Sequence, residues 1–596
     1  MKTAVFDIET NGITDWSTLS DLETVHCLVI KDGEGIHRYQ NHNIMEGLIR
    51  LSEAECLVAH NGIGFDMPAL HKLYGFEHEK IIDTVVLARL CHPDLKNEDY
   101  KRSNFRRNLI GSHSLEAWGE RIGVSKDSHG KTEDWSQYSK EMEEYCVQDV
   151  IVNEALYAEL LHEKFSMQAC WLEMDFAKAI HRQEQNGFPF DSVAADTLTC
   201  TLVGRRAELQ EELQKVFPPT ILETKTHWWL DKNDNKFPTK KAMLESGYKP
   251  ADCIKGPLKT KQIPFNPNSR DQISERLIAS GWKPKHYEGK RPTINEPVLR
   301  AINTEQSLKL LEYLLLSKRL GQLNEGAQAW TKLVRNGRIH SSVNTNGAVS
   351  GRTTSRNPNM QQVPSVSSEY GAECRACFTA PEGKVLVGAD ASGLELRMLA
   401  SYLHPIDGGA YTKELLEGDI HTANQKAAGL PDRASSKRFI YSFLYGGGDS
   451  LIGEVVGGTA KDGKRIKKEF LEKMPAMATL TKAVQRKVKN FGYLKGLDGR
   501  ILPSRSEHSA LNLLLQSAGS ICTKLAVNLF TERMKGKDYE LHAYVHDEVQ
   551  FSCDAGNAEE YGKLFVKCIA DAGEILNVKC PLDGDYKIGK NWTETH

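Results

Sequence analysis

The sequence predicts a multidomain protein that combines α/β and α+β folds. At 596 residues the chain is long enough for roughly three to five domains. Helical stretches separate an early series of strand-like runs, which indicates an α/β unit over about the first 185 residues. These early runs are 3–8, 25–30, 34–40 and 55–60. Further along, a mostly helical block at 411–535 is flanked by strand-like runs at 339–343, 384–390 and 541–553.

The composition is typical of an intracellular globular protein. Hydrophobic residues make up 40% and charged residues 26% of the chain, which are ordinary values for a globular fold. No run of about 18 apolar residues appears, so the sequence predicts no membrane span. Asp7 and Glu9 fall where a signal peptide would need its apolar core. The cysteines are scattered, and the lone pair Cys374 and Cys377 is a weak zinc signal, so we expect reduced thiols.

The helical pattern is interrupted once, in the middle of the chain. Before the interruption, helices are expected at 66–75, 84–91, 113–122, 139–165 and 170–216. From Phe217 to Pro264, prolines, lysines and the pair Trp228–Trp229 break the periodicity, which favours an inserted, loop-rich segment. Helical periodicity returns at 270–280 and 303–334.

Acidic residues recur in the first α/β unit. Asp7 and Glu9 are two residues apart in FDIE, so both side chains leave the same face of a strand. We expect this first strand to be central, where two carboxylates repel each other unless a cation joins them. Asp66 lies at a loop-to-helix junction, and Tyr145 and Asp149 share one helix face because they are four residues apart. A D-x-E pair alone is more often structural, so only the combination is informative.

Two later strands each carry an aspartate at one end. Asp390 ends the strand that begins VGADASGLELRMLA, and Asp547 interrupts the strand-like HAYVHDEVQF together with His546 and Glu548. Both have structural alternatives, since Asp390 could cap the following helix and HDE could form a tight turn. Two strands that each present a carboxylate at a turn could also hold a pair of metal ions.

A helix between these aspartates repeats a cationic or aromatic residue at every fourth position. In PDRASSKRFIYSFLYGGGD, Asp432 is suited to cap the helix and Gly446–Gly448 to end it. The cations lie near the positive N-terminus, which suits a polyphosphate, and the rings suit stacking on a base. A solvated basic face is the alternative, but two tyrosines before three glycines argue against it. The repeating residues, which share one broad face, are Arg433, Lys437, Tyr441 and Tyr445.

The first set of residues resembles the DEDD exonuclease superfamily in its Tyr-containing branch. The resemblance covers about residues 1–185 and implies an RNase H-like 3′–5′ exonuclease domain. It implies that Asp7, Glu9 and Asp149 hold one Mg²⁺ and that Asp7 with Asp66 serves a second. Tyr145 would orient the attacking water.

The second set resembles motifs A, B and C of family A DNA polymerases. DASGLELR, FIYSFLYG, LNLLLQSAG and YVHDEVQ are most similar to the replicative polymerases of short-tailed bacteriophages of the T-seven type, and the match extends over nearly the whole chain. The resemblance implies a right-hand polymerase domain that extends primers on a DNA template, with proofreading. The expected domains are exonuclease 1–185, thumb 186–340 with the insert 217–264, palm 341–410, fingers 411–500 with the motif B helix 433–445, and palm again 501–596.

The same resemblance implies roles for residues around the polymerase site. Asp390 and Asp547 would bind two Mg²⁺, with the Ala391 carbonyl as a further ligand and Glu548 in support. Mn²⁺ could substitute for Mg²⁺. His421, Arg433 and Lys437 would hold the β- and γ-phosphates, and Glu395 would exclude a ribose 2′-OH. Tyr441 would favour acceptance of dideoxynucleotides and Tyr445 would stack near the templating base. The residues expected at the primer–template minor groove are Arg352, Asn512, Gln516 and His546.

The expected partners are primer–template DNA and dNTPs. The insert 217–264 lies where phage relatives carry a segment that binds host thioredoxin, so the resemblance leaves open a processivity factor there, and thioredoxin in particular. A helicase–primase and a single-strand-binding protein are also left open. The expected location is the cytoplasm of a bacterial host if a phage encodes the chain.

Three other functions are alternatives to a DNA polymerase. A single-subunit RNA polymerase shares a carboxylate pair and a Lys/Tyr helix, but Glu395 and the N-terminal carboxylates argue against it. A non-catalytic primer–template clamp would be expected to lack one of the carboxylates, and none is missing. An exonuclease with a silent C-terminal half is disfavoured by the intact helix 433–445.

Overall fold

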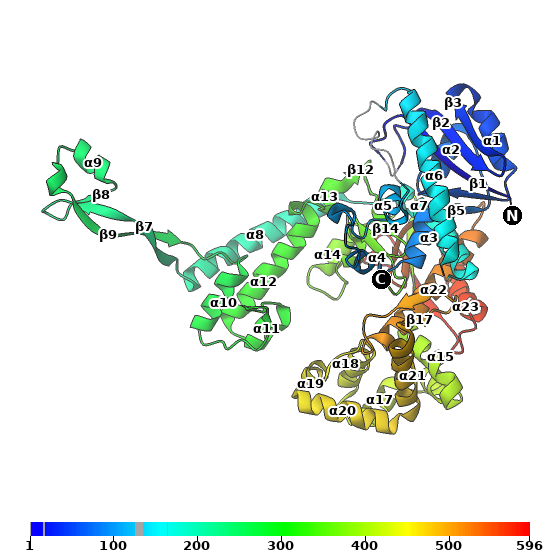
Figure 1. Cartoon of the computed structure of the whole chain (residues 1–596). Helices are drawn as coiled ribbons and strands as arrows, with labels where there is room; N and C mark the ends of the chain where they lie inside the picture. Colours follow the sequence, from blue (N-terminus) through cyan, green and yellow to red (C-terminus); the bar gives the residue numbers. More distant parts are fainter. Residues whose placement is uncertain (1, 16–17, 125–134, 164) are drawn as a thin grey trace. The chain divides into compact units, whose positions relative to one another are not determined.

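The computed structural model describes residues 2–15, 18–124, 135–163 and 165–596. The chain forms two compact units, one made of Met1–Asp191 with Leu333–His596 and the other of Ser192–Lys332 (Figure 1). The first unit contains two hydrophobic cores, each built on its own β-sheet.

The N-terminal core surrounds a five-stranded sheet of order β3-β2-β1-β4-β5. β1 pairs antiparallel with β2 and parallel with β4, so the first strand is central, as the sequence predicts. β4 and β5 are buried at every position, which is typical of parallel strands covered on both faces. The strands are β1 (Thr3–Thr10), β2 (Val25–Asp32), β3 (Gly35–Gln40), β4 (Cys56–Ala59) and β5 (Ile81–Asp83).

Helices lie at the four expected positions in this part of the chain, and α1 and α4 are two further helices that the sequence analysis did not predict. The longest of them, α6, packs along β1 and β2, and Ser139 caps it by accepting a hydrogen bond from the Met142 N–H. The helices are α1 (Ile44–Ser52), α2 (Asp66–Tyr74), α3 (Thr84–Cys91), α4 (Leu95–Asp99), α5 (Leu115–Ile122) and α6 (Lys140–His162).

Helix α7 (Met167–Asn186) belongs to both cores of the first unit. Cys170 and Met174 lie in the N-terminal core, whereas Leu172 and Phe176 lie in the second core. A helix that is apolar on more than one face is buried on more than one face. α7 therefore joins the two cores through packing.

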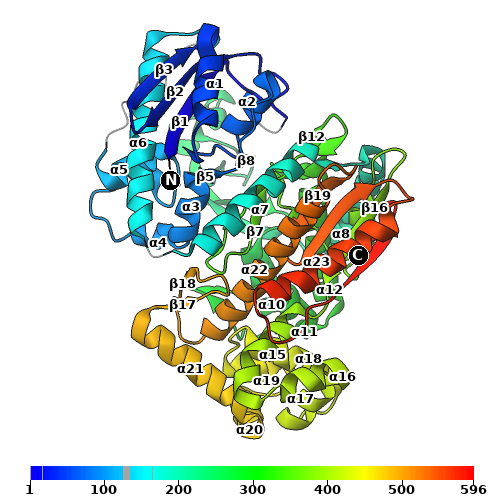
Figure 2. The same ribbon diagram turned by 90° about the vertical axis from the view of Figure 1, so that its right-hand side faces the viewer.

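The second core surrounds a four-stranded antiparallel sheet of order β19-β20-β16-β21. α23 packs against β16 and β21, and α22 packs against both α7 and α23 (Figure 2). The elements are β16 (Val385–Ala391), β19 (Glu540–Val545), β20 (Glu548–Cys553), β21 (Gly584–Gly589), α22 (Ala510–Arg533) and α23 (Ala558–Ile575).

The block between β16 and β19 is mostly helical, as predicted, but a hairpin interrupts it. β17 (Tyr493–Lys495) and β18 (Ile501–Pro503) form this hairpin just before α22. The helices are α15 (Leu394–Asp407), α16 (Ala410–Glu417), α17 (Ile420–Ala428), α18 (Arg433–Leu444), α19 (Asp449–Val455), α20 (Ala460–Lys473) and α21 (Pro475–Phe491).

The expected helix at 170–216 is two helices. The break comes at Gly187, which has a φ of 63°, and at β6 (Phe188–Pro189). A positive φ and a proline both end helical geometry, so the chain turns there before α8 begins. The shorter elements that follow are α13 (Trp330–Leu333), β12 (Val334–Arg335), β13 (Arg338–Ile339), β14 (Ser342–Asn344), β15 (Thr354–Arg356) and α14 (Gly371–Ala376).

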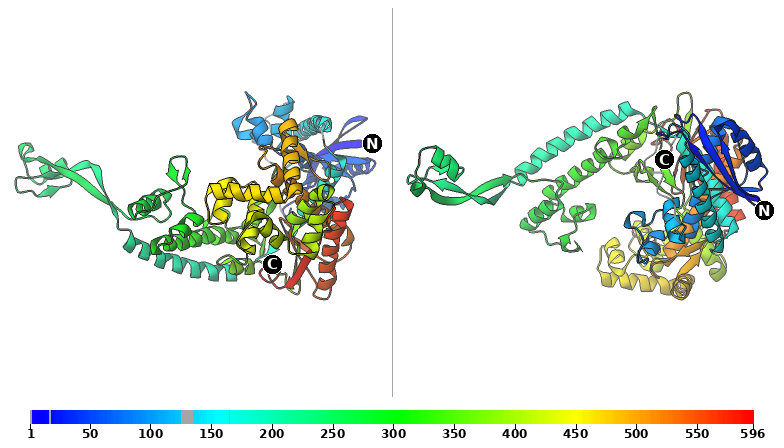
Figure 3. Two further views of the ribbon diagram at one scale, coloured as in Figure 1. Left: turned by 90° about the horizontal axis from the view of Figure 1, so that it is seen from below. Right: turned by 45° about the horizontal axis from the view of Figure 1, so that its top comes forward.

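The second unit is built on a pair of long helices. α8 and α12 lie side by side (Figure 3). The capping box of α12 is complete, because Thr304 and Ser307 each accept a backbone N–H from the other. The elements are α8 (Ser192–Val216), α10 (Arg270–Ala279), β10 (Tyr287–Glu288), β11 (Arg291–Pro292), α11 (Glu296–Ile302) and α12 (Glu305–Leu320).

The insert at 217–264 is a β-ribbon, so the expectation of a loop-rich segment is wrong. β7 (Thr220–Leu230) pairs with β8 (Lys236–Phe237) and β9 (Ile254–Ile263), and α9 (Lys240–Glu245) follows β8. The β-branched and aromatic residues of TILETKTHWWL favour a strand, although few of its positions are buried. The two tryptophans each lie under a lysine: Lys259 Nζ is 5.0 Å from the Trp228 ring and Lys240 Nζ is 5.2 Å from the Trp229 ring.

One helix of the described residues, α22, is long and apolar enough to span a membrane by those two criteria alone. Its most apolar 18-residue window is 72% buried inside the protein, where it packs on α7 and α23. A core helix produces the same signal, and the packing accounts for it here.

Candidate active sites

The first acidic cluster lies on the central strand of the N-terminal sheet. Asp7 and Glu9 leave the same face of β1, with the buried Ile8 between them facing the core. One oxygen of each carboxylate and the Cys146 sulfur all lie within 4.8 Å of one another. The Cys146 thiol donates to the carbonyl oxygen of Asp7 at 3.4 Å and to its Oδ2 at 3.5 Å. Burial raises the pKa of Cys146, and contacts with Cys27 and Asp7 act in the same direction, so the thiol keeps its proton.

Asp66 and Asp149 extend this cluster. Asp66 is the first residue of α2 and is only 2% exposed. Burial raises its pKa to about 7, and the negative charges of Asp83 and Asp149 act in the same direction. In the part of the chain that the structure describes, Asp66 Oδ1 has no hydrogen-bond partner. A buried, unsatisfied carboxylate oxygen among like charges suits a cation.

Helix α6 supplies the remaining residues predicted for this site. Tyr145 and Asp149 both belong to α6, which packs against β1. The Tyr145 ring meets the edge of Trp135, with 6.0 Å between ring centroids. The structure thus brings Asp7 and Glu9 beside α6 and places Asp66 close enough to feel the charge of Asp149.

Sequence reasoning missed Cys146 and Asp83 near this cluster. Asp83 caps α3 by accepting the Val85 N–H, and it also accepts the N–H groups of Asn61 and Ile63 in the loop before Asp66. Asp83 and Thr84 follow a short apolar run, and an aspartate at such a position is a helix-capping signal that could have identified Asp83. No local signal marks Cys146, because its neighbours come from β1.

The second acidic cluster lies in the middle of the four-stranded sheet. In the strand register, Asp390 on β16 stands opposite Glu548 on β20 and opposite Asp585 on β21. The Ala391 N–H donates to the Asp547 carbonyl at 3.3 Å, which fixes the hairpin of Asp547 beside the end of β16. Asp390 is exposed at the end of β16, yet the protein that encloses part of its carboxyl raises its pKa to about 7, and the charges of Asp547 and Glu548 act in the same direction. Burial also raises the pKa of Asp547.

The charged HDE sequence forms a two-residue hairpin turn. Val545 and Glu548 are paired, so only His546 and Asp547 lie in the turn. His546 has a φ of 60°, a left-handed value that glycine usually provides in such hairpins. Holding another residue there costs on the order of 1 kcal/mol and is common at functional sites. The turn and the functional interpretation are therefore compatible, because the turn is what places Asp547 at the strand ends.

Glu548 is held in its ionised form by several partners. Its Oε1 accepts from Trp592 Nε1 at 2.5 Å and Gln550 Nε2 at 2.7 Å, and its Oε2 lies 2.9 Å from His596 Nδ1. Arg375 lies 3.7 Å away. Burial alone would raise the pKa of Glu548, but the His596 hydrogen bond and the Arg375 charge lower it overall. The sequence did not indicate these partners, which come from distant segments.

Glu395 is clamped from two sides. Tyr445 Oη lies 2.8 Å from both carboxylate oxygens of Glu395, and Arg352 donates to its Oε1 at 3.2 Å. Arg352 and Glu395 line one small cavity with His546 and Asp547, so the structure brings together residues from three separate motifs. Ser520 of α22 also lines this cavity. Asn512 and Gln516 precede Ser520 by eight and four residues, so they share its helix face.

The helix predicted at 433–445 is α18, and its N-terminus gathers cationic groups. Asp432 caps it by accepting the Ser435 N–H at 2.7 Å. Arg433 Nε lies 2.9 Å from Asp419 Oδ2. Burial lowers the pKa of His421, and the charges of Arg433 and Lys437 lower it further, so His421 is neutral near pH 7. At the other end of α18, the Tyr441 and Tyr445 ring centroids are 6.3 Å apart.

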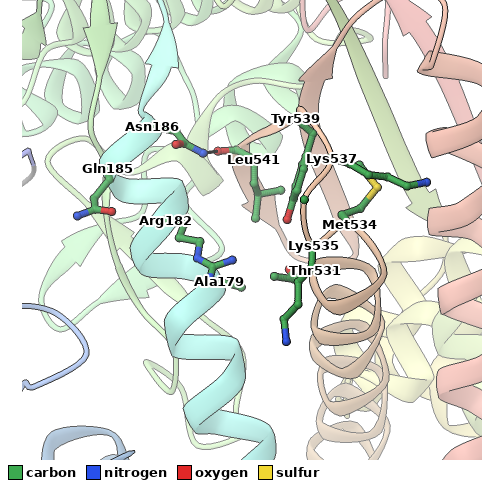
Figure 4. A pocket seen from close by; sticks show the side chains of 11 residues that line it. Ala179, Arg182, Gln185, Asn186, Thr531, Met534, Lys535, Lys537, Tyr539 and Leu541 are labelled. Atoms are coloured by element: carbon green, nitrogen blue, oxygen red, sulfur yellow. Dashed lines mark hydrogen bonds between the residues drawn. The ribbon is translucent and has the colours of Figure 1, made fainter. Parts of the chain in front are cut away.

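A larger cavity lies away from both clusters. It has a volume of about 390 Å³ and is bordered by α7, the end of α22 and the start of β19 (Figure 4). Arg182, Lys535 and Lys537 line it, and Asn186 crosses its edge by donating to the Leu541 carbonyl at 3.0 Å. None of the residues predicted for either site lines this cavity, so cavity size does not identify the active sites here.

The fold is that of a nucleic-acid polymerase domain. The structure is similar to a solved structure described as the POL domain of Pol1 from M. smegmatis in complex with DNA primer-template and dNTP. The TM-score is 0.74 at 17% sequence identity, over 99% of this chain and 95% of that one. The predicted fold class, an RNase H-like exonuclease domain followed by a right-hand polymerase domain, is confirmed.

Sequence comparison identifies the family. Residues 253–594 match the model for DNA polymerase family A. The chain is 36% identical to the DNA-directed DNA polymerase of Enterobacteria phage T3 and 35% identical to that of Escherichia phage T7, over 99% of this chain and 100% of each relative. It is also 24% identical to DNA polymerase I of Aquifex aeolicus, over 100% of this chain and 98% of that protein. The chain belongs to DNA polymerase family A and is a DNA-directed DNA polymerase.

Family membership decides between the functions that the sequence left open. It excludes the RNA polymerase alternative, and it makes a non-catalytic clamp or a silent C-terminal half unnecessary. Family A DNA polymerases use divalent metal ions, and both acidic clusters contain the oxygen ligands that such ions prefer. The T3 alignment runs over 713 residues, more than the 596 of this chain, so that relative carries segments without a counterpart here.

Gly388 on β16 offers a test of how Glu548 is supported. A Cβ at this position would lie 2.2 Å from the Thr595 carbonyl and 2.3 Å from Gln550 Nε2. Gly388→Ala should therefore displace the segment that carries Trp592 and His596, and with it the hydrogen bonds of Glu548. We expect slower primer extension at saturating dNTP and unchanged hydrolysis of single-stranded DNA. Gly556→Ala is the control, because a Cβ at Gly556 meets nothing within 4 Å. Gly383→Ala is unsuitable as a control because Gly383 has a positive φ. Equal extension rates for the two variants would contradict this account.

Proposed function

We propose that this DNA polymerase replicates a phage genome in the host cytoplasm, extending primer 3′ ends with dNTPs and removing mismatched ends at a separate 3′–5′ exonuclease site. The observation that carries the proposal is the presence of two acidic clusters, one on β1, α2 and α6 and one on β16 and the β19–β20 hairpin. Each has a carboxylate, Asp66 or Asp390, whose pKa is raised to about 7 by the loss of water around it. The similarity to the phage T3 and T7 polymerases over their full length supports the phage role.

Two Mg²⁺ ions at each cluster fit the residues present. Asp390, Asp547 and the Ala391 carbonyl would hold them at the polymerase site. Asp7, Glu9, Asp66 and Asp149 would hold them at the exonuclease site. When bound, such ions acidify the attacking hydroxyl and neutralise charge on the phosphates, and Mn²⁺ has the coordination chemistry to substitute. The charges of Asp547 and Glu548 already disfavour ionisation of Asp390, so a cation there relieves repulsion.

The N-terminal end of α18 is suited to bind the triphosphate. Arg433 and Lys437 provide positive charge at the N-terminal end of α18, where the helix dipole also favours an anion. Neutral His421 can donate one hydrogen bond to a phosphate oxygen without adding charge. Positioning and charge neutralisation are most of what phosphoryl transfer requires from a protein. In the free protein Asp419 pairs with Arg433, and the incoming phosphates would take its place.

The clamp on Glu395 is suited to select the sugar and the base pair. Tyr445 and Arg352 fix the Glu395 carboxylate, so a ribose 2′-OH would have to displace a charged group that is already hydrogen-bonded. Tyr445 is 47% exposed, which leaves one ring face for the templating base. Arg352 and His546, with Asn512 and Gln516 on α22, would contact the minor groove, where both base-pair orientations present the same acceptors.

At the exonuclease site, Tyr145 would orient the water that attacks the terminal phosphodiester. Its phenol lies on the same helix as Asp149, one turn away, and its ring is supported by Trp135. The thiol of Cys146 donates a hydrogen bond to Asp7, which holds that carboxylate in position without competing for its charge.

Substitutions that remove one carboxylate from each cluster should separate the two activities. Asp547→Asn should stop primer extension and leave 3′–5′ degradation intact, whereas Asp7→Asn should do the reverse. Each loss should exceed about 100-fold, because even groups behind the metal ligands contribute roughly 10- to 100-fold. Both activities are measured on one labelled primer–template, with and without dNTPs. Chelation of divalent ions by EDTA should abolish both, and the loss of both activities in either single variant would show that the sites are not independent.

Tyr441 should determine how readily dideoxynucleotides are accepted. Burial raises the pKa of Tyr441, and the charges of Glu395 and Asp547 act in the same direction, so its ring lies near both acids. A nucleotide bound at these acids would have its sugar near the Tyr441 hydroxyl. We propose that this hydroxyl replaces the missing 3′-OH. Tyr441→Phe should then increase discrimination against dideoxynucleotides by roughly 10- to 100-fold, the worth of a hydrogen bond to a charged group. Competition between dNTP and ddNTP in single-nucleotide extension measures it, and an unchanged ratio would reject this role.

The β7–β9 ribbon fits a processivity element. Ile221 is 63% exposed, Leu222 48% and Ile254 49%, on strands that also carry exposed lysines. Exposed apolar residues beside cations are suited to a protein partner that in turn holds the duplex. We propose that a host processivity factor, thioredoxin among the candidates, or duplex DNA itself binds this ribbon. A helicase–primase and a single-strand-binding protein remain proposals without a located surface.

Removal of the ribbon should shorten the DNA made in one binding event. A variant in which 225–260 is replaced by a short Gly/Ser linker should show shorter tracts under a heparin trap, with the single-turnover extension rate unchanged. Host thioredoxin added to the full chain should lengthen tracts if it is the partner. Tract lengths that are the same with and without the ribbon would contradict the proposal.

A further inference from the structure

Four charged side chains are buried together beneath the polymerase site. Glu173 comes from α7, Lys524 from α22, and Asp498 and Arg500 from the turn between β17 and β18. Each of the four side chains is 2% exposed or less. Glu173 Oε1 accepts from Lys524 Nζ at 2.6 Å and from Arg500 at 2.7 Å, and Arg500 also reaches Asp498 at 2.6 Å. We call these four residues the buried charge cluster.

The buried charge cluster is not explained by stability alone. It contains two cations and two anions, so it has no formal net charge. Transferring such groups out of water is unfavourable, and well-packed apolar residues in their place often give a protein that is as stable or more so. Burial lowers the pKa of Lys524 to about 8, which reflects this cost. The ion pairs and hydrogen bonds of Glu173 Oε1 do, however, fix one geometry of the surrounding chain, while Glu173 Oε2 has no hydrogen-bond partner among the described residues.

The chain that the cluster fixes is the loop between β14 and β15. Lys524 donates to the Thr345 carbonyl at 2.8 Å, and both Lys524 and Arg500 reach Asn346 Oδ1 at 3.3 Å. Further along the loop, a Cβ on Gly351 would lie 2.6 Å from the Arg500 guanidinium. The Gly351 carbonyl accepts from Ser520 at 3.0 Å. The loop is therefore held at both of its ends by the cluster and by α22.

The next residue of this loop is Arg352. Its guanidinium donates to Glu395, and Glu395 is also held by Tyr445 at the end of α18. A continuous series of contacts thus runs from Glu173 through Lys524 and the loop to Arg352 and the clamp on Glu395. Glu173 also stands on the helix that belongs to both cores of the first unit.

We infer that the buried charge cluster positions Arg352, and through it Glu395, for selection of the incoming nucleotide. The inference rests on the proposed role of Glu395 in excluding the ribose 2′-OH. Glu173, Asp498, Arg500 and Lys524 are positioning residues, since none of them lines the cavity that Arg352 and Glu395 share. Because Glu173 lies on α7, the nucleotide site takes its alignment in part from the helix that packs against the exonuclease core.

The first test is Glu173→Gln in the full chain. Glutamine keeps the shape but removes the negative charge that Lys524 and Arg500 share, so the loop should lose its fixed position. We expect kcat/KM for dNTPs to fall by roughly 10- to 100-fold, the effect of a displacement of about 1 Å near a reacting group. Discrimination between dNTPs and rNTPs should fall as well, and hydrolysis of single-stranded DNA should stay unchanged.

A matched control comes from another fully buried ion pair. Arg121 and Asp99 are both 0% exposed and lie 2.9 Å apart in the N-terminal core. Asp99→Asn should lower the melting temperature as Glu173→Gln does, but it should not change dNTP kinetics or rNTP discrimination. Both variants are assayed well below their melting temperatures, so that the folded fraction is equal.

A double-mutant cycle tests the connection to the clamp. If the cluster acts through Arg352, the effects of Glu173→Gln and Arg352→Ala on rNTP discrimination should be far from additive. Additive effects, or wild-type discrimination in folded Glu173→Gln, would overturn the inference. So would an equal loss of exonuclease activity.

A second variant keeps the test valid if Glu173→Gln does not fold. Glu173→Met with Lys524→Met replaces one cation and one anion by apolar residues of similar length, which often preserves stability. The folded double variant should still misselect the sugar, because the Thr345 carbonyl has lost its donor and Asn346 Oδ1 keeps only the one from Arg500. Wild-type selectivity in this variant would show that the cluster is only structural. If Asp547→Asn abolishes primer extension while these variants still extend primers, the proposed function stands. A failure of the inference is then distinct from a failure of the proposed function.

Discussion

Repulsion between carboxylates that are forced together in a buried sheet is the constraint around which this protein is arranged. Asp390 has an acidic residue opposite it on each neighbouring strand, and Asp547 lies at the adjoining turn. Partial enclosure by the protein and like charge both raise the pKa of Asp390, so a divalent cation relieves what the fold creates. Glu548 escapes this repulsion because Trp592, His596 and Arg375 surround it. The protein itself therefore stabilises the negative charge of Glu548, whereas Asp390 and Asp547 would need a metal ion to stabilise theirs.

The exonuclease cluster applies the same constraint with different elements. Its acids come from a central strand and a long helix rather than from a hairpin, and the proton of Cys146 offsets part of the charge on Asp7. Each cluster is anchored in its own hydrophobic core, which would keep the two proposed metal sites apart within one chain. α7 belongs to both cores and gives the two sites a shared structural support.

Around the polymerase cluster, the proposed selection of nucleotides would depend on hydrogen bonds between separate motifs. Glu395 follows Asp390 on the next helix, Tyr445 ends α18, and Arg352 comes from a loop far earlier in the chain. The hydrogen bonds of Tyr445 and Arg352 to Glu395 would fix the shape of the proposed nucleotide pocket before any nucleotide is bound. This is the condition under which a pocket rejects an added hydroxyl. The buried charge cluster extends this arrangement into the core.

The sequence by itself determined the local motifs: the paired acids of β1, the capped helix α18 and the charged hairpin around Asp547. Each depends on periodicity, capping or turn chemistry within a few residues, so it can be recognised from the sequence without knowledge of the fold. The ribbon at 217–264 was misread because its strands pair with each other and bury little, which leaves a weak pattern. Only the tertiary structure decided which partners hold Glu548, that Cys146 joins Asp7, and that Glu173 meets Lys524 and Arg500. These contacts join residues from distant segments, and one sequence contains no local signal for them.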